Sequence, residues 1–445
     1  MSFPKLNIRR NMTLVIACAV FGVAGATCIS NNVLSLLAIK LGAGDIFLGF
    51  LAASFTLPLI LGVFSMNAIE KYGKLKILTF WTAISTFIVL LFLLVPTLAT
   101  NNKTHLALIL LLVIQLCTAS AGAMGNTAWF PLLKETTPPR LIGRFFATLR
   151  TSWQTASIIT FLSIAFFFGE KTEWWKFKII FVAAFVLLFS RFILLLFIKE
   201  KEAKIPFTKH QKIIERFKEV FANKQLRYCI IYLCCYSFLA AAPEPFKIKM
   251  LKQLGFSSGY ILAATSMLGV GAIISLRFWG KLADSFGNRA IFSISHVGMI
   301  VTAILWIVID KNSFSKIAVM ILYFSFGIFH SGNGIAQTRY VLNAVPETKP
   351  NYINIVNFTT FFFISLAPII AGLFLTLTKN ISFSSGALNM NNYHILFVLT
   401  GTLFIIPHLL RRKLRVAKEK STSDVVAFVI RPLRNIFGPF KNLNR

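Results

Sequence analysis

Residues 280–289 read Gly280-Lys281-Leu282-Ala283-Asp284-Ser285-Phe286-Gly287-Asn288-Arg289, a short polar stretch between two long apolar runs at residues 257–282 and 290–309. A glycine at each end would let two helix ends approach closely, because no Cβ stands between them. We expect Asp284 either to pair with Arg289 or to lie at the N-terminus of a neighbouring helix. The stretch therefore predicts a tight, charged turn between two antiparallel helices.

A second, degraded copy of this stretch lies at residues 66–75, Met-Asn-Ala-Ile-Glu-Lys-Tyr-Gly-Lys-Leu. It keeps an acid at Glu70 and the second glycine at Gly73, whereas Met66 replaces the first glycine. Two other landmarks repeat at a similar distance, a Leu-Gly pair and a proline in a loop. The separations are 214 residues for Gly73 and Gly287, 213 for Gly42 and Gly255, and 208 for Pro138 and Pro346. Three landmarks in one register predict a duplicated unit.

The composition is that of an integral membrane protein. Of the 445 residues, 56% are hydrophobic and only 14% are charged. The apolar residues form runs of about 20, long enough to cross about 30 Å of hydrocarbon. Twelve such runs can be drawn, at residues 12–39, 46–69, 77–98, 106–129, 144–168, 178–198, 226–248, 257–282, 290–309, 317–342, 352–377 and 393–410.

The 280–289 stretch resembles the signature loop of the major facilitator superfamily of secondary transporters. In that family the loop joins the second and third helices of each half. The resemblance covers about residues 12–410 and implies an all-α membrane protein of twelve transmembrane helices in two pseudo-symmetric six-helix bundles. It also implies alternating-access transport of a small solute, without a cofactor. We therefore expect an N-terminal half at 1–198, a cytoplasmic linker at 199–225, a C-terminal half at 226–410 and a basic tail at 411–445.

The basic residues predict the orientation in the membrane. An even number of spans puts both termini on one side. The short loops of the two sides carry similar numbers of Lys and Arg, but residues 199–227 add 9 and residues 411–445 add 10 on the terminal side. By the positive-inside rule this side is cytoplasmic, in a bacterial inner membrane. The net charge of +31 thus predicts contact with anionic lipids rather than with nucleic acid.

The linker contains an amphipathic pattern. Apolar residues at 213, 214, 217, 220 and 221 recur with helical spacing, with Lys and Glu opposite. This pattern predicts a helix that lies on the inner leaflet and ties the two halves together.

Polar side chains in the spans point to a substrate cavity. In the family that the chain resembles, the first and fourth helices of each half line the cavity. Polar groups in hydrocarbon cost a few kcal/mol unless they face a cavity or a partner, and here they concentrate on those helices, whereas spans three and twelve have almost none. Interhelical hydrogen bonding is the alternative role. The cavity candidates are Asn31, Asn32, Gln115, Asn126, Tyr236, His330, Asn333 and Gln337.

Glu244 is the only carboxylate well inside an apolar run. Pro243 and Pro245 flank it, and we expect them to break the helix there. The carboxylate could carry a coupling proton, form an ion pair with Lys247 or Lys249, or reach water at the outer end.

Two further groups of charged or turn residues are functional candidates. The first would form a conformational latch, and its members are Gly280, Asp284, Gly287, Arg289, Glu70 and Gly73. The second comprises Arg150 and Arg339, which would favour an anionic substrate if they turn inward. The simpler interpretation, which also covers Arg191 and Arg277, is that these side chains snorkel to lipid phosphates.

Several functions are disfavoured by the sequence. No glycine-lysine pair is followed by the Ser or Thr of a phosphate-binding loop, and the histidines are scattered over several spans. We therefore expect neither ATP-driven transport nor a hydrolase, and no metal site. Two alternatives stay open, a non-transporting sensor or assembly protein on the same fold and a translocator of lipids or hydrophobic compounds. We expect a monomer.

Overall fold

The computed structural model describes residues 5–138, 141–199, 213–346, 349, 352–385 and 388–414. The first half comprises α1 (Lys5–Cys28), α2 (Asn31–Lys40), α3 (Asp45–Thr56), η1 (Leu57–Leu61), α4 (Gly62–Tyr72), α5 (Lys74–Val89), η2 (Leu90–Leu93), α6 (Leu94–Thr100), α7 (Thr104–Asn126), α8 (Trp129–Thr136), α9 (Ile142–Phe168) and α10 (Trp174–Leu196). The linker helix is α11 (Ile213–Ala222). The second half comprises α12 (Lys224–Ala241), α13 (Glu244–Gln253), α14 (Ser258–Phe286), α15 (Asn288–Ile304), η4 (Leu305–Val308), α16 (Ser313–Ala344), α17 (Tyr352–Leu377), β1 (Ser382–Ser385), β2 (Leu388–Asn391), α18 (Asn392–Leu403), α19 (Ile405–Leu410) and η5 (Arg411–Lys413).

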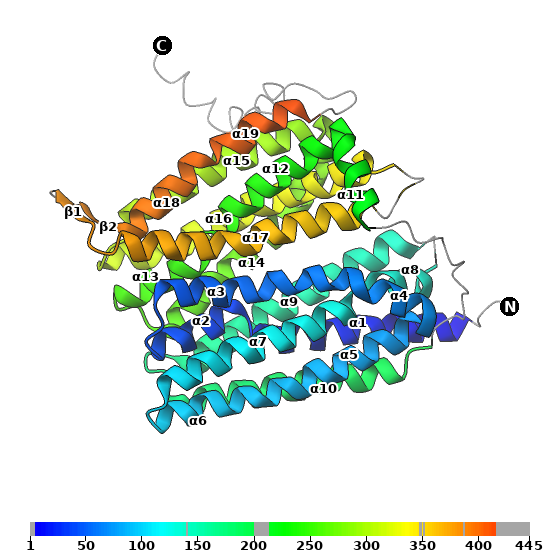
Figure 1. Ribbon diagram of the computed structural model, residues 1–445, viewed down its shortest axis with the longest axis horizontal. Helices are drawn as coiled ribbons and strands as arrows, with labels where there is room; N and C mark the ends of the chain where they lie inside the picture. The colour runs from blue at the N-terminus through cyan, green and yellow to red at the C-terminus, as the bar shows by residue number, and fades with distance from the viewer. Residues whose placement is uncertain are drawn as a thin grey trace, which may run out of the picture.

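Twelve helical stretches of the described residues are long and apolar enough to span a membrane, and they confirm the twelve predicted runs. Six belong to residues 9–196 and six to residues 224–413. Figure 1 shows them as two helical bundles lying side by side, blue to cyan below and green to orange above. The prediction of an all-α, twelve-helix membrane protein is correct. The sequence did not predict the small antiparallel hairpin of β1 and β2, between α17 and α18.

The repeated glycines adopt one conformation at equivalent places. Gly42 and Gly255 have φ of +84° and +89°, and Gly73 and Gly287 have φ of +93° and +85°. These left-handed values favour glycine at the sharp turns between helices. The expectation that Gly280 allows two helix ends to approach closely is wrong, because a Cβ there would meet no atom within 4 Å. The turn at 280–289 is also tighter than expected, since α14 continues to Phe286 and α15 begins at Asn288.

The first span of each half is broken. In the first span, α1 ends at Cys28 and α2 begins at Asn31. In the seventh span, α12 ends at Ala241 and α13 begins at Glu244. Pro243 explains the second break, as expected from the sequence. The first break has no proline, so the sequence did not reveal it, yet both breaks lie 213 residues apart, at Ser30 and Pro243. Discontinuous helices at matching positions of two repeats are typical of transporter binding regions.

The apolar cores divide the molecule into two unlike ends. We call the end that carries α11 and the α4–α5 and α14–α15 turns the terminal end, and the opposite one the far end. At the far end, one cluster of buried residues joins both halves, with Leu37 and Phe181 from the first and Phe246 and Leu262 from the second. At the terminal end, each half has its own separate cluster. The two bundles are therefore packed together only toward the far end.

Glycine contacts and an ion pair hold the far end together. α3 packs along α17, where a Cβ on Gly49 would lie 2.5 Å from the carbonyl oxygen of Pro368. α9 packs against α14, and the amide of Gly259 donates to the carbonyl of Gly169 over 3.2 Å. Asp45 at the start of α3 accepts from Lys249 and from the Tyr393 hydroxyl, each over 2.9 Å. These contacts cross between the two bundles.

The linker helix α11 packs on the second bundle. Val220 is buried, and the Phe217 ring meets that of Phe358 on α17 at 5.5 Å between centroids. Glu219 accepts from Lys349 over 2.7 Å, and this hydrogen bond raises the pKa of the Lys349 ammonium above its usual value. The apolar side of the predicted amphipathic helix therefore packs partly against the second bundle and partly faces outward. The linker residues 200–212 and the tail residues 415–445 lie outside the described part of the chain.

Candidate functional site

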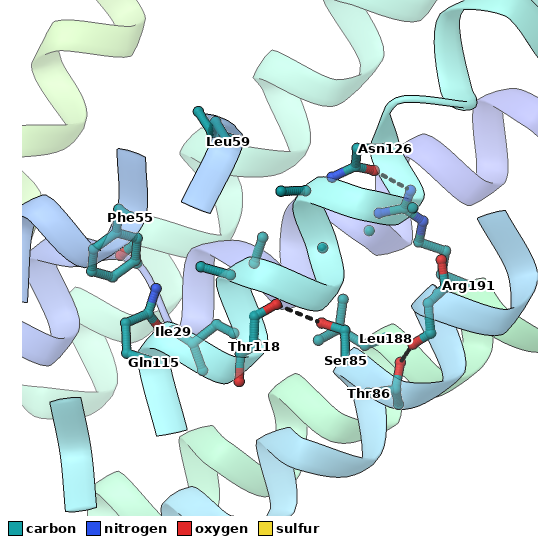
Figure 2. A pocket seen from close by; sticks show the side chains of 18 of the residues that line it. Ile29, Phe55, Leu59, Ser85, Thr86, Gln115, Thr118, Asn126, Leu188 and Arg191 are labelled. Atoms are coloured by element: carbon teal, nitrogen blue, oxygen red, sulfur yellow. Dashed lines mark hydrogen bonds between the residues drawn. The ribbon is translucent and has the colours of Figure 1, made fainter. Parts of the chain in front are cut away.

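A cavity of about 380 Å³ lies inside the first bundle (Figure 2). One face of α7 forms its longest wall, with Gln115, Thr118, Gly122 and Asn126 spaced three or four residues apart. Side chains at this spacing lie above one another along a helix. The cavity therefore follows α7 for about 16 Å, the length of eleven residues at 1.5 Å each.

The other walls come from α1, α2, α3, η1, α5 and α10. The break between α1 and α2 contributes Ser30 and Asn31. α5 contributes small hydroxyl side chains, of which Ser85 donates to the carbonyl of Thr118 over 3.3 Å. α10 contributes Arg191, which reaches across to Asn126 (Figure 2). The expectation that the third span offers no polar groups to a cavity is wrong, because its hydroxyls Thr82, Ser85 and Thr86 all line this one.

The predicted cavity residues of the first half are largely brought together. Asn31, Gln115 and Asn126 line the cavity, whereas Asn32 is not among its lining residues. Asn31 accepts from Ser35 over 3.3 Å, and Gln115 is 3% exposed.

The predicted residues of the second half lie apart from this cavity, in a hydrogen-bond network between α12, α15 and α16. The Tyr232 hydroxyl donates to the Oδ1 of Asn333 over 2.9 Å and lies 2.9 Å from Nε2 of His296. The Tyr236 hydroxyl lies 3.0 Å from Nδ1 of His330. Tyr232, Tyr236, His296 and Asn333 are buried, so interhelical hydrogen bonding is the role that the structure gives them.

Two of the predicted residues on α16, His330 and Gln337, differ from the buried ones. His330 is exposed although it lies in the middle of α16, and its ring stacks on Phe326 at 5.5 Å between centroids. Gln337 lies two turns further along α16, and its Nε2 has no hydrogen-bond partner. His330 is thus exposed, and Gln337, like Asn333 with its Nδ2, has an amide nitrogen without a hydrogen-bond partner among the described residues.

Glu244 forms an ion pair with Lys247, one turn away on α13, with 2.6 Å between Oε1 and Nζ. The Lys247 side chain is 4% exposed and that of Glu244 31%. The ammonium also lies 4.6 Å from the centre of the Phe326 ring and 5.3 Å from that of Trp306. Of the roles considered from the sequence, the ion pair with Lys247 is the one observed, and Lys249 pairs with Asp45 instead.

The proposed latch involves a residue from another span. Asp284, at the end of α14, pairs with Arg339 of α16, with 2.6 Å between Oδ1 and Nη1. From the sequence, the expected partner of Asp284 is Arg289 or a helix N-terminus, and that of Arg339 is lipid phosphate or an anionic substrate. In the first half, Glu70 has its Oε2 buried without a hydrogen-bond partner. The position 213 residues before Arg339 is Asn126, so the first half has no equivalent ion pair there.

The arginines near the terminal end point in different directions. Arg150 and Arg277 are exposed on their helices, consistent with snorkelling. Arg191 instead turns into its bundle, where Nη2 donates to Oδ1 of Asn126 over 3.1 Å and the guanidinium lies 5.4 Å from the centre of the Trp129 ring. The sequence placed Arg191 among the snorkelling residues. The signal that could have identified it is the lack of any carboxylate in the surrounding spans.

Comparisons with known proteins agree with this architecture. A sequence model of the Major Facilitator Superfamily matches residues 14–368, and a second match covers residues 245–440. No curated protein sequence matches the chain.

Solved transporters share the fold at low sequence identity. The nucleoside transporter NupG is 12% identical, with a TM-score of 0.68 over 92% of this chain and 99% of that one. A D-xylose–proton symporter is 14% identical, with a TM-score of 0.67 over 89% and 97%. The xylose transporter XylE from E. coli, in an inward open conformation, is 13% identical, with a TM-score of 0.66 over 95% and 99%. With the family match, the twelve spans and the repeated turns together, the chain belongs to the Major Facilitator Superfamily and is a multi-pass secondary transporter of small molecules rather than an enzyme.

Proposed function

We propose that the chain carries a small polar solute across a bacterial cytoplasmic membrane by alternating access, and that the structure corresponds to the inward-facing state. The observation that carries this proposal is the unequal packing of the two ends. One apolar core joins the bundles at the far end, whereas the terminal end has two separate cores. A rocking transporter needs such a difference, because only one entrance can be open at a time.

The polar cavity beside α7 is the proposed solute site. It has space for a small organic molecule and offers amides and hydroxyls as hydrogen-bond partners. The amides, hydroxyls and Arg191 in this lining favour a solute that carries hydrogen-bonding groups over a purely hydrophobic compound. His330 and Gln337 are the proposed contacts from the second bundle in the closed, occluded state.

The remaining assignments follow from the charge distribution. We propose that the terminal end is cytoplasmic, that the basic linker and tail contact anionic lipids, and that the protein acts as a monomer with halves at 1–198 and 226–410. Glu244 is the proposed proton-coupling residue, because a proton bound there would release Lys247. The Asp284–Arg339 pair is the proposed latch, together with the glycine turns.

Distance measurements between spin labels test the proposal. One pair joins positions 72 and 342 at the terminal end, and the other joins 106 and 314 at the far end; all four side chains are exposed. The labels would be attached to introduced cysteines after the exposed Cys117 is replaced. We expect two populations whose distances change in opposite directions at the two ends. A single fixed distance at both ends, in liposomes over a range of pH and solutes, would contradict alternating access.

A further inference from the structure

The cavity beside α7 contains polar atoms that no group in the described part of the chain satisfies. Oγ of Ser30, Oε1 of Gln115, Oγ1 of Thr118 and Nε of Arg191 are buried without a hydrogen-bond partner, and all four residues line the cavity. Buried polar groups are normally paired, so each exception calls for an explanation. Four exceptions around one cavity indicate a ligand that supplies the partners.

Arg191 brings a positive charge to this cavity that the described protein does not balance. Its contacts are the neutral Asn126 amide and the Trp129 ring. No carboxylate in the described part of the chain forms an ion pair with it. Within the six spans of the first half the only acid is Asp45, which is engaged at the far end by Lys249 and Tyr393. An unpaired charge within a span marks a functional site.

The position of Arg191 argues against a lipid phosphate as its partner. It lies five residues from the end of α10, about 7.5 Å along the axis, so it could extend toward the membrane surface. It crosses α1 instead, at Gly22, where a Cβ would lie 2.7 Å from both Cδ and Nη1 of Arg191. The glycine makes room for the guanidinium beside the cavity.

From these contacts we propose that Arg191 binds the anionic group of the transported solute, a carboxylate or a phosphate ester; this assignment rests on the proposed transport function. The free Nε–H and an adjacent Nη–H form an edge of the guanidinium that suits two oxygens of such a group. The acceptor Oε1 of Gln115, further along α7, requires a donor on the ligand. The solute is therefore an organic anion with hydroxyl or amino groups away from its charge.

Binding to the full-length protein in detergent tests the assignment. The probes are D-glucuronate and D-glucose 6-phosphate, matched against neutral D-glucose, with inorganic phosphate as a further arm. Thermal stabilisation gives apparent affinities, and counterflow in proteoliposomes reports exchange of the same compounds. The variants are Arg191→Gln, Arg191→Lys and, as a control, Arg277→Gln on the exposed face of α14.

We expect an anionic probe to stabilise the wild type and the Arg277→Gln control alike. Arg191→Gln should weaken this binding at least tenfold, and Arg191→Lys should recover only part of it, because an ammonium lacks the two-pronged geometry. The carboxylate and phosphate arms distinguish the two anion types. Without a ligand, Arg191→Gln should melt no lower than the wild type, since it removes a half-buried charge that no carboxylate in the described part of the chain balances.

Three results would count against the assignment. D-glucose and the anionic probes could bind or exchange equally well, in the wild type and in Arg191→Gln alike. The proposed anion site would then be wrong, although the proposed transport function would stand. If no probe, charged or neutral, binds or exchanges, both the anion site and the proposed function lose support. If Arg191→Gln lowers the ligand-free melting temperature and leaves anion affinity unchanged, Arg191 is structural.

Discussion

Acidic residues are few in the spans of this protein, and each of them forms an ion pair. Each one pairs with a base from a defined place: Glu244 with Lys247 inside α13, Asp45 with Lys249 across the halves, and Asp284 with Arg339 between two helices of one bundle. Their exposure differs widely, and so do the effects that we expect from removing them.

The Glu244–Lys247 pair should be strongly coupled. Glu244→Gln leaves the ammonium of Lys247, 4% exposed, without its counter-charge. Breaking a buried ion pair costs about 3–5 kcal/mol, and we expect about 3 because Glu244 is itself 31% exposed. The double variant Glu244→Gln with Lys247→Met should recover most of the loss in melting temperature. Equal losses in the single and double variants would show that the pair is not coupled.

If Glu244 carries the coupling proton, both variants should also lose the pH dependence of solute uptake.

The Asp284–Arg339 pair should affect transport more than stability. Its side chains are 76% and 41% exposed, and exposed pairs contribute less than about 1 kcal/mol. Asp284→Ala should therefore leave the melting temperature and membrane insertion nearly unchanged while reducing uptake. The exchanged pair Asp284→Arg with Arg339→Asp should restore part of the uptake. Unchanged uptake of Asp284→Ala in reconstituted vesicles would remove the latch role.

At the scale of helices, the contact between α3 and α17 is set by small residues. Gly49 faces the backbone of Pro368, and a Cβ on Gly372 would lie 2.6 Å from the carbonyl oxygen of Asp45. Helices that approach this closely in a membrane associate through backbone packing, since burial of apolar side chains gives little advantage over lipid.

Gly49→Ala should therefore push α3 away from α17 and favour opening of the far end. The distance between labels at 106 and 314 should lengthen, and that between 72 and 342 should shorten. Gly334→Ala is the matched control, because a Cβ at Gly334 of α16 would meet no atom within 4 Å. If both alanine variants give the wild-type distances, the glycine contact does not control the far end.

The sequence predicted the helices and their turns better than it predicted the site. Long apolar runs and the repeated glycines depend on local chemistry, so their positions could be read directly, as for Gly73 and Gly287. The break at Ser30 and the role of Arg191 depend on packing between distant segments. The sequence does not single out the serine and threonine hydroxyls of α5, because a helix can satisfy such groups itself, as Thr86 does by donating to the carbonyl of Thr82 over 2.7 Å.

For the whole molecule, the polar contacts of Asp45 join the two bundles on the side where the apolar core is shared. Lys249 and Asp45 are 12% and 15% exposed, so their attraction is less screened by water than that of the Asp284 pair. Closure of the far end is thus favoured by charge as well as by apolar packing.

Asp45→Asn should weaken this closure and shift the population toward the outward-facing state. We expect a greater fraction of long distances between labels at 106 and 314. Tyr393→Phe, which removes the hydrogen bond to Asp45 and the one accepted from Gln253 but keeps the ion pair, should give a smaller shift in the same direction. Identical populations in all three proteins would show that apolar packing alone closes this end.

The interruptions at Ser30 and Pro243 have one more consequence. The short segments α2 and α13 lie against each other, whereas α1 contacts α9 and α10 of its own bundle and α12 contacts α17 of its own. Each segment is joined to its long partner by two residues outside the helices, residues 29–30 and 242–243. Asn31, the first residue of α2, lines the cavity, so a bound solute would contact α2 directly. Exit of the solute toward the outside would then begin with a local movement of α2 and α13, before the two bundles tilt.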